Sequence, residues 1–272
     1  MRQLNIRFLL YPSLVYRKLL QGFNFVTRFL SLIVISLLLI LPNMAHGQQL
    51  KLESVTPYGC YFHHLSLKSG EKLNLINGYG SGVSIRFRIN KFLAMGIECA
   101  YNNLKIDQDD AVEQWNWKFW EKFYGAYIRD LQERDSNYVV ILTPFQYINI
   151  IPVHLVAIAH FPNRTIFTPS LSIAGGVYFY KRNLWLREQW QKHFPDLNYT
   201  YEYEFNNYAE AHRGRVYGAR VGFGGYIALS KYMKLNLMGK YHHIINIGRE
   251  ENYDNFPMNS FFEFSLGVSF FR

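Results

Sequence analysis

The last residues of the chain, Asn259 to Arg272, alternate between two kinds of side chain. The apolar set is Phe262, Phe264, Leu266, Val268 and Phe270, and the polar or very small set is Glu263, Ser265, Gly267 and Ser269. A period of two predicts a β-strand, because successive side chains of a strand point to opposite faces of the sheet. In a soluble sheet the apolar face meets a core, whereas in a transmembrane barrel it meets lipid and the small polar face meets the lumen.

The composition favours the transmembrane barrel. Aromatic and charged residues each make up 18% of the chain, yet the mean hydropathy is slightly negative, at -0.11. A helical membrane protein needs runs of about 20 apolar residues. A barrel instead alternates along each strand and carries aromatic girdles at the two membrane interfaces.

Residues 1–47 predict a cleaved signal peptide, and residues 48–272 the mature domain. Arg28 precedes the apolar run Phe29–Leu41, and a small-residue site, Ala45-His46-Gly47, follows it. A charge, an apolar core of this length and a small-x-small site are typical of secretory signals, so we expect export.

The formal net charge of +9 overstates how basic the mature chain is. Residues 1–47 hold five basic residues and no acidic one, and the rest of the chain opposes 24 basic to 20 acidic residues. No basic run or nucleic-acid module is present, so we expect no nucleic-acid partner.

Short polar turns alternate strictly with long connections after residue 48. The turns lie at 89–91, 161–165 and 230–232, between segments that alternate in polarity. The predicted strands are 50–65, 78–89, 92–106, 139–160, 166–182, 214–229, 233–247 and 259–272. This order is typical of the turns and outer loops of an outer-membrane barrel. The sequence therefore predicts an all-β fold, an eight-stranded antiparallel transmembrane up-and-down β-barrel.

We expect regular secondary structure in two long outer loops, at about 107–138 and 183–213. Apolar residues recur at near-helical spacing in 110–134, which predicts a helical insertion in the first loop. The second is rich in Trp, Tyr, Glu and Arg, and we expect strand extensions there. Pro152 predicts a bulge or a weak pairing in the fourth strand. Cys60 and Cys99 fall on strands that are not neighbours, so we expect two free thiols.

Several segments resemble small outer-membrane barrels of the PorT-like group and their OmpA/OmpX-like relatives. They are Tyr147–Leu155 with its Ile-Pro pair, Gly222–Tyr226, Met233–Ile247 and Leu266–Phe270. The resemblance implies an eight-stranded barrel in the cell outer membrane, inserted by the barrel assembly machinery, which reads an aromatic-ended last strand. This chain ends on Phe271-Arg272 rather than on an aromatic residue.

The inward positions of the predicted strands collect ionisable side chains. They are Arg86, Arg88, Glu98, Arg220, Lys234, Lys240 and Glu263. One interpretation is a small anion-preferring pore. We favour an ion-paired plug, because side chains can fill an eight-stranded barrel and buried charges must pair.

A lipid A-modifying enzyme is the main enzymatic alternative. His243 and Asn246 match the His-x-Ser-Asn run of the PagL-type lipid A deacylases, which are also eight-stranded barrels. Ile245 takes the nucleophile position, and this chemistry needs a serine beside its histidine. We therefore expect no enzymatic activity, or an inactive relative of such enzymes. We also expect His63-His64 and His242-His243 to be polar rim residues rather than metal ligands, and we expect no cofactor.

All five tryptophans fall in the predicted outer loops. They are Trp115, Trp117, Trp120, Trp185 and Trp190. They either bind an extracellular protein or glycan, as aromatic hot spots do, or pack the loops and rest among lipid headgroups. The sequence predicts a non-enzymatic barrel, surrounded by outer-membrane lipid, with a structural or adhesive role through these loops.

Overall fold

A computed structural model describes residues 51–67, 73–108, 111–115, 117–161, 165–245 and 255–271. Residues 51–272 form one compact unit. The predicted signal peptide lies outside the described residues. None of the helices in the described ranges is long and apolar enough to cross a membrane.

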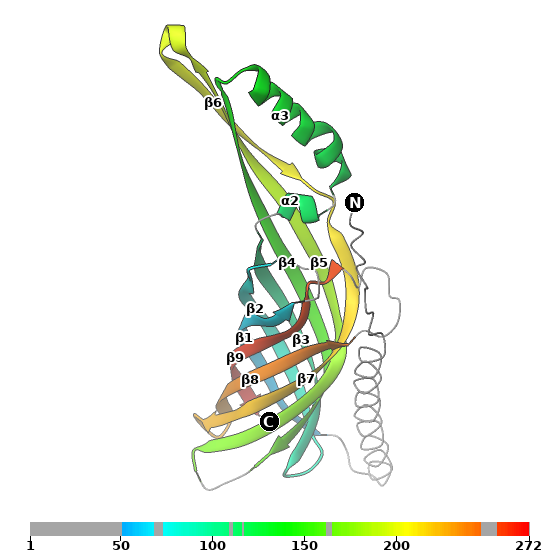
Figure 1. Ribbon diagram of the computed structural model, residues 1–272. Helices are drawn as coiled ribbons and strands as arrows, with labels where there is room; N and C mark the ends of the chain where they lie inside the picture. Colours follow the sequence, from blue (N-terminus) through cyan, green and yellow to red (C-terminus); the bar gives the residue numbers. More distant parts are fainter. Residues whose placement is uncertain are drawn as a thin grey trace, which may run out of the picture. The chain divides into compact units, whose positions relative to one another are not determined.

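The strands of the described ranges form one antiparallel sheet (Figure 1). They are β1 (Lys51–Leu67), β2 (Leu75–Arg88), β3 (Leu93–Asp107), β4 (Tyr138–His160), β5 (Phe167–Phe194), β6 (Tyr199–Tyr208), β7 (His212–Ala228), β8 (Met233–Ile245) and β9 (Met258–Phe271). Eight of them pair in the order β4-β3-β2-β1-β9-β8-β7-β5, and β5 closes the ring on β4. This closed ring confirms the predicted eight-stranded up-and-down barrel.

The ninth strand, β6, lies outside the ring. The pairing of β5 with β7 ends at Arg182, which pairs with His212. After Arg182, β5 continues without a β7 partner to Phe194. The chain turns through a 3-10 helix, Pro195–Leu197, and through Asn198 in the left-handed region (φ 45°), a conformation that Asn tolerates better than most residues. β6 then returns antiparallel along β5. The strand extensions expected in 183–213 are therefore present.

The connection between β3 and β4 is helical, as predicted. It contains α2 (Ala111–Gln114), a π-helix, η1 (Trp120–Tyr124), and α3 (Gly125–Arg134). The helix expected over 110–134 is not continuous, because α2 ends at Gln114 and Trp115 turns away to stack on His212 of β7. We call this insertion, β6, the part of β4 before Gln146 and the part of β5 after Arg182 the arm (Figure 1).

Pro152 weakens one strand pairing without forming a bulge. In the pairing of β4 with β3, Cys99 pairs with Val153 and Asn102 pairs with Ile150, and the two pairs between them are missing. The register is the same on both sides of this gap, so no residue is inserted. Against β5 the ladder continues through Pro152. A proline lacks the backbone N–H that a ladder needs, so the effect is confined to one neighbour.

Candidate functional site

The outer wall of the barrel carries an apolar band. Along β5 the outward positions from Phe167 to Phe179 are apolar, proline or glycine, and Lys181 is the first charged residue beyond them. At about 3.3 Å per residue and a tilt of about 45°, this stretch spans roughly 28 Å, close to the height of about 25 Å usual for such bands.

An aromatic girdle closes the band at its outer edge. Each ring strand supplies one outward aromatic residue towards the long connections: Tyr61, Tyr79, Tyr101, Tyr147, Phe179, Tyr217, Tyr241 and Phe262. Aromatic residues are typical of the membrane–water interface, and six of these eight are tyrosines, whose rings carry a polar tip. The wall therefore meets lipid, and the opposite face of each strand lines the lumen.

The middle of the lumen holds a continuous ion-pair network. Arg220 donates to both carboxylate oxygens of Glu98, at 2.5 and 3.1 Å. Lys240 bridges Glu98 and Glu263, with its Nζ at 2.8 and 2.6 Å from their Oε1 atoms. His242 Nε2 lies 3.0 Å from Oε2 of Glu263. Since every one of these side chains is buried, the charges satisfy one another as low-dielectric burial requires.

Two tyrosines complete this network. The Tyr58 hydroxyl donates to Glu98 at 2.9 Å, and the Tyr178 hydroxyl lies 2.9 Å from Nδ1 of His242. Gly218 makes room for Tyr178, because a Cβ at Gly218 would lie 2.8 Å from a Tyr178 ring carbon. The small residue on β7 thus decides where the large one on β5 lies.

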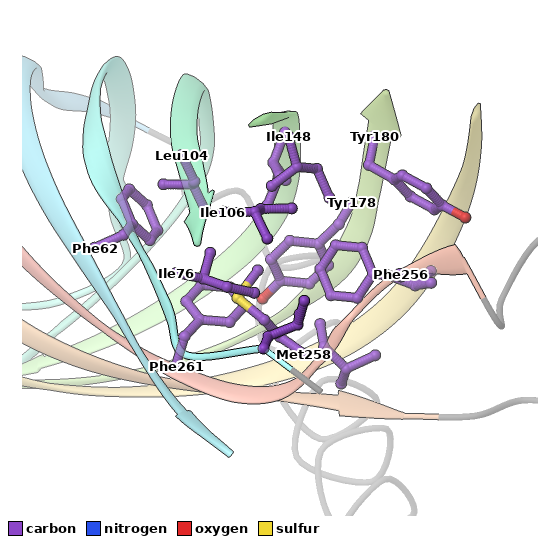
Figure 2. Close-up of a cluster of buried hydrophobic side chains, with 14 of the residues drawn as sticks. Phe62, Ile76, Leu104, Ile106, Ile148, Tyr178, Tyr180, Phe256, Met258 and Phe261 are labelled. Carbon is purple, nitrogen blue, oxygen red and sulfur yellow. The ribbon is translucent and has the colours of Figure 1, made fainter. Parts of the chain in front are cut away.

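An apolar layer fills the lumen between this network and the outer end of the barrel (Figure 2). Its members include Phe62, Ile76, Leu104, Ile148, Tyr178, Phe256, Met258 and Phe261. The ring of Phe261 stacks on His242 with centroids 4.4 Å apart, which joins the two layers. In the described residues, a polar layer and an apolar layer both fill the cross-section, so this geometry disfavours an open conduit.

The other three ionisable residues predicted for the lumen lie outside the network. Arg86 is buried and donates to Ser84 Oγ at 3.2 Å. Arg88 is half exposed and pairs with Glu53 at 3.2 Å, at the end with the short turns. Lys234 lies over the ring of Phe271, 4.2 Å from its centroid.

The histidines and tyrosines of the lumen are not among the residues predicted for the charge network. His242 was expected as half of a polar rim pair, but the structure buries it completely. His154 is also buried, with its ring against Tyr178 at 4.8 Å. Both lie at inward positions of their strands, so the two-residue period was the signal that would have placed them.

The arm has a packed interior of its own, built on one face of β4 and β5. Trp120, Ile128, Leu186 and Trp190 form its buried cluster. Beside it, the fully buried Glu188 accepts hydrogen bonds from the Tyr124 hydroxyl at 2.8 Å, Trp190 Nε1 at 2.9 Å and Asn207 Nδ2 at 2.6 Å. Burial, and then the neighbouring Glu188, raise the pKa of Tyr124. The insertion, β5 and β6 are thus held together by one carboxylate.

The five tryptophans predicted as binding residues differ in their exposure to solvent. Trp115, Trp120 and Trp190 are buried, and Trp115 stacks on His212 at 4.2 Å. Trp117 and Trp185 are partly exposed. Trp185 stacks between Phe145, at 4.3 Å, and Tyr208, at 6.3 Å, on the other face of the arm. Trp117 packs against the buried cluster of the arm and stacks on Trp120 at 5.8 Å. Trp117 and Trp185 therefore each combine a packed face with an accessible one, and they are the candidates for contact with a partner.

A cleft of about 900 Å³ opens where the insertion meets the start of β7. Its lining residues are Trp115, Trp117, Lys118, Phe119, Glu210, Ala211, His212 and Arg213. Phe119 is 57% exposed beside it. Aromatic faces next to both cationic and anionic side chains suit a ligand with apolar and polar parts.

The described residues of the histidine run of β8 point to opposite faces of the strand. His243 points outward and is exposed, and Ile245 follows it, while Asn246 lies outside the described residues. The inward His242 contacts Glu263 and Tyr178 in the filled lumen. Among the described residues, no group of three or more His, Cys, Asp or Glu side chains is placed to hold a metal ion. Cys60 and Cys99 are free thiols, as predicted.

The apolar girdled wall and the filled polar lumen define an eight-stranded membrane-spanning β-barrel. No protein-family model matches the sequence, and no curated protein matches it. Among solved structures, Neisserial surface protein A shares 13% identity over 80% of this chain and 96% of its own, with a TM-score of 0.42. OprG of Pseudomonas aeruginosa shares 10% identity over 82% of this chain and 94% of its own, with a TM-score of 0.38.

The attachment invasion locus protein Ail of Yersinia pestis is similar at the same level. It shares 8% identity over 82% of this chain and 99% of its own, with a TM-score of 0.36. Similarities this low carry no inference about what this chain binds.

Proposed function

We propose that this chain is a non-enzymatic outer-membrane barrel that binds an extracellular protein or glycan through its arm. The cleft between the insertion and the start of β7 carries this proposal. A filled lumen leaves the outer surface as the place for function, and the arm extends that surface beyond the end of the ring (Figure 1). Concave sites lined by aromatic and a few polar groups are the usual form of a ligand site.

The exposed aromatic residues of the arm support the same proposal. On β6, Tyr199, Tyr201, Tyr203 and Tyr208 are 54%, 49%, 40% and 71% exposed. Exposed aromatic clusters are typical of interaction surfaces. Glu188 and the tryptophan cluster hold this surface rigid, which lowers the entropy lost on binding.

The proposal includes a location in the cell outer membrane. The predicted signal peptide 1–47, the apolar wall and the aromatic residues of β9 support export, surrounding outer-membrane lipid and insertion by the barrel assembly machinery. Membership of the PorT-like group stays a prediction. A deacylase requires a hydroxyl or thiol nucleophile that is hydrogen-bonded to its histidine base. Among the described residues, no hydroxyl or thiol is hydrogen-bonded to His243.

A paired-variant binding experiment tests the proposal. The folded barrel in detergent micelles is applied to a glycan array and to a panel of immobilised extracellular-matrix proteins. The Trp117→Ala/Phe119→Ala variant removes two aromatic faces of the cleft. Phe123→Ala is the matched control, because Phe123 is 61% exposed on the same insertion but does not line the cleft.

We expect wild type and Phe123→Ala to bind the same partner, and the cleft variant to bind at least about tenfold more weakly, as the loss of aromatic hot spots implies. Equal weakening of both variants would contradict the assignment to the cleft. No binding to either panel by wild type would contradict an adhesive role.

A further inference from the structure

Two cations lie directly opposite each other on the outer wall of the barrel. Lys181 of β5 and Arg213 of β7 are register partners, and both side chains are exposed. Cross-strand partners on one face bring their Cβ atoms within about 5.5 Å, and like charges so placed destabilise a sheet. In the described ranges neither residue makes an ion pair with a carboxylate. An anion shared between them would remove the repulsion.

The height of this pair on the wall indicates the source of that anion. Lys181 comes two residues after Phe179, and Arg213 four residues before Tyr217, and both aromatics belong to the girdle that ends the apolar band. The first polar layer beyond such a girdle is where lipid headgroups lie. Arg215, which pairs with Phe179, adds a third exposed cation on the same face.

Neutral hydrogen-bonding groups continue the row beside this pair. Asn103 pairs with Asn149, and Asn149 pairs with Lys181, so the outward-facing row crosses four strands. Asn149 Oδ1 accepts from the Tyr101 hydroxyl at 3.0 Å and from Asn103 Nδ2 at 2.9 Å. This arrangement leaves the Asn149 amide NH₂ without a protein acceptor in the described ranges. The row therefore offers an amide donor next to two cations, which are the groups that bind a phosphate.

We propose that Lys181 and Arg213, flanked by Asn149 and Arg215, bind the phosphate of an outer-leaflet lipid headgroup at the β5–β7 seam. This site is on the lipid-facing wall and shares only Arg213 with the cleft proposed for the arm. Membrane anchoring of this seam would hold the base of the arm at a constant height above the lipid.

Native mass spectrometry of the folded full-length barrel tests this proposal. The protein is released from detergent micelles doped with equal amounts of phosphatidic acid and phosphatidylcholine of matched acyl chains. Variants are Lys181→Gln and Lys181→Gln/Arg213→Gln. The matched control is Lys118→Gln/Lys122→Gln, which removes two cations from the insertion of the arm.

We expect wild type and the control to retain phosphatidic acid preferentially. Each surface cation near an anionic headgroup contributes about a fivefold preference, so the double variant should lose about twenty-fivefold and Lys181→Gln alone about fivefold. An unchanged preference in the double variant, or equal retention of both lipids by wild type, would overturn the proposal. Adding inorganic phosphate distinguishes the source, because displacement of the lipid by it would make free phosphate the ligand.

Arg213 also borders the cleft of the arm, so the single variant separates the two proposals. Lys181→Gln should weaken lipid retention and leave binding of the arm's partner unchanged. Loss of partner binding in Lys181→Gln with lipid retention intact would contradict the lipid site and not the cleft.

Discussion

Arg220 and Glu98 are 122 residues apart in the chain and form a two-point ion pair inside the barrel. Their side chains are 1% and 4% exposed. They belong to β7 and β3, which are not neighbours in the ring, so the pair crosses the lumen. Removing one member of such a pair leaves the other charge buried without a partner.

We expect Glu98→Gln to destabilise the barrel by about 3–5 kcal/mol, because Arg220 and Lys240 both lose a carboxylate in a buried site. Urea unfolding in lipid vesicles, followed by tryptophan fluorescence, measures the change in the free energy of unfolding. Asp130→Asn is the control, since Asp130 is an exposed partner of Arg134 and such pairs contribute about 0–1 kcal/mol. Equal stability of the two variants would show that the lumen is hydrated and screened.

We expect Glu188→Leu to destabilise the arm and to leave the barrel folded. Three donors lose their acceptor at once, at about 1–3 kcal/mol for each group left unsatisfied. Limited proteolysis should then cut the arm faster, while the unboiled protein keeps its compact migration on a denaturing gel. Glu202→Leu on exposed β6 should leave the cleavage rate unchanged. If Glu188→Leu also abolished compact migration, arm and barrel would fold as one cooperative unit.

The wall residue Phe264 gives a direct test of which face meets lipid. It is 58% exposed on β9. An arginine on the lipid face costs from about 0–1 kcal/mol near the interfaces to about 2–4 kcal/mol at the membrane midplane. Phe264→Arg should therefore lower the yield of heat-modifiable, folded barrel. Tyr208→Arg, on the arm, should not. Unimpaired folding of Phe264→Arg would place this face in water.

The two thiols should differ in reactivity in the folded protein. Cys60 is buried in the apolar layer, and Cys99 points to the outer wall and is partly exposed. A membrane-permeant maleimide should label Cys99 and spare Cys60, and a charged, impermeant maleimide should label neither in vesicles. Boiling in detergent should expose both. Rapid labelling of Cys60 without boiling would mean that the lumen opens.

The filled lumen should also block ion flow. In a planar bilayer, the folded wild-type protein should give no conductance steps, because Phe62, Phe261 and the network below them occupy the cross-section. Bilayers with detergent alone provide the baseline. Regular steps that grow with salt concentration would favour the anion-preferring pore.

The sequence by itself determined the barrel and the direction of most side chains. A two-residue period is a local property, so it gave the eight ring strands and correctly faced Glu98, Arg220, Lys240 and Glu263 inward. The turn and loop lengths placed the insertion and the extended hairpin at one end. Such features depend on neighbours in the chain, and a single sequence contains them.

Only the tertiary structure decided which of those residues meet. Arg220 forms its ion pair with Glu98 and not with Glu53. Which carboxylate it reaches depends on the relative heights of residues on strands that are not neighbours in the ring. The same holds for His242, which the period faces inward but which becomes a partner of Glu263 and Tyr178 only once β5, β8 and β9 are in register. The tryptophans of the arm are buried or accessible according to how the insertion folds back on β5. These outcomes depend on distances across the lumen and the arm, and periodicity along one strand carries no information about them.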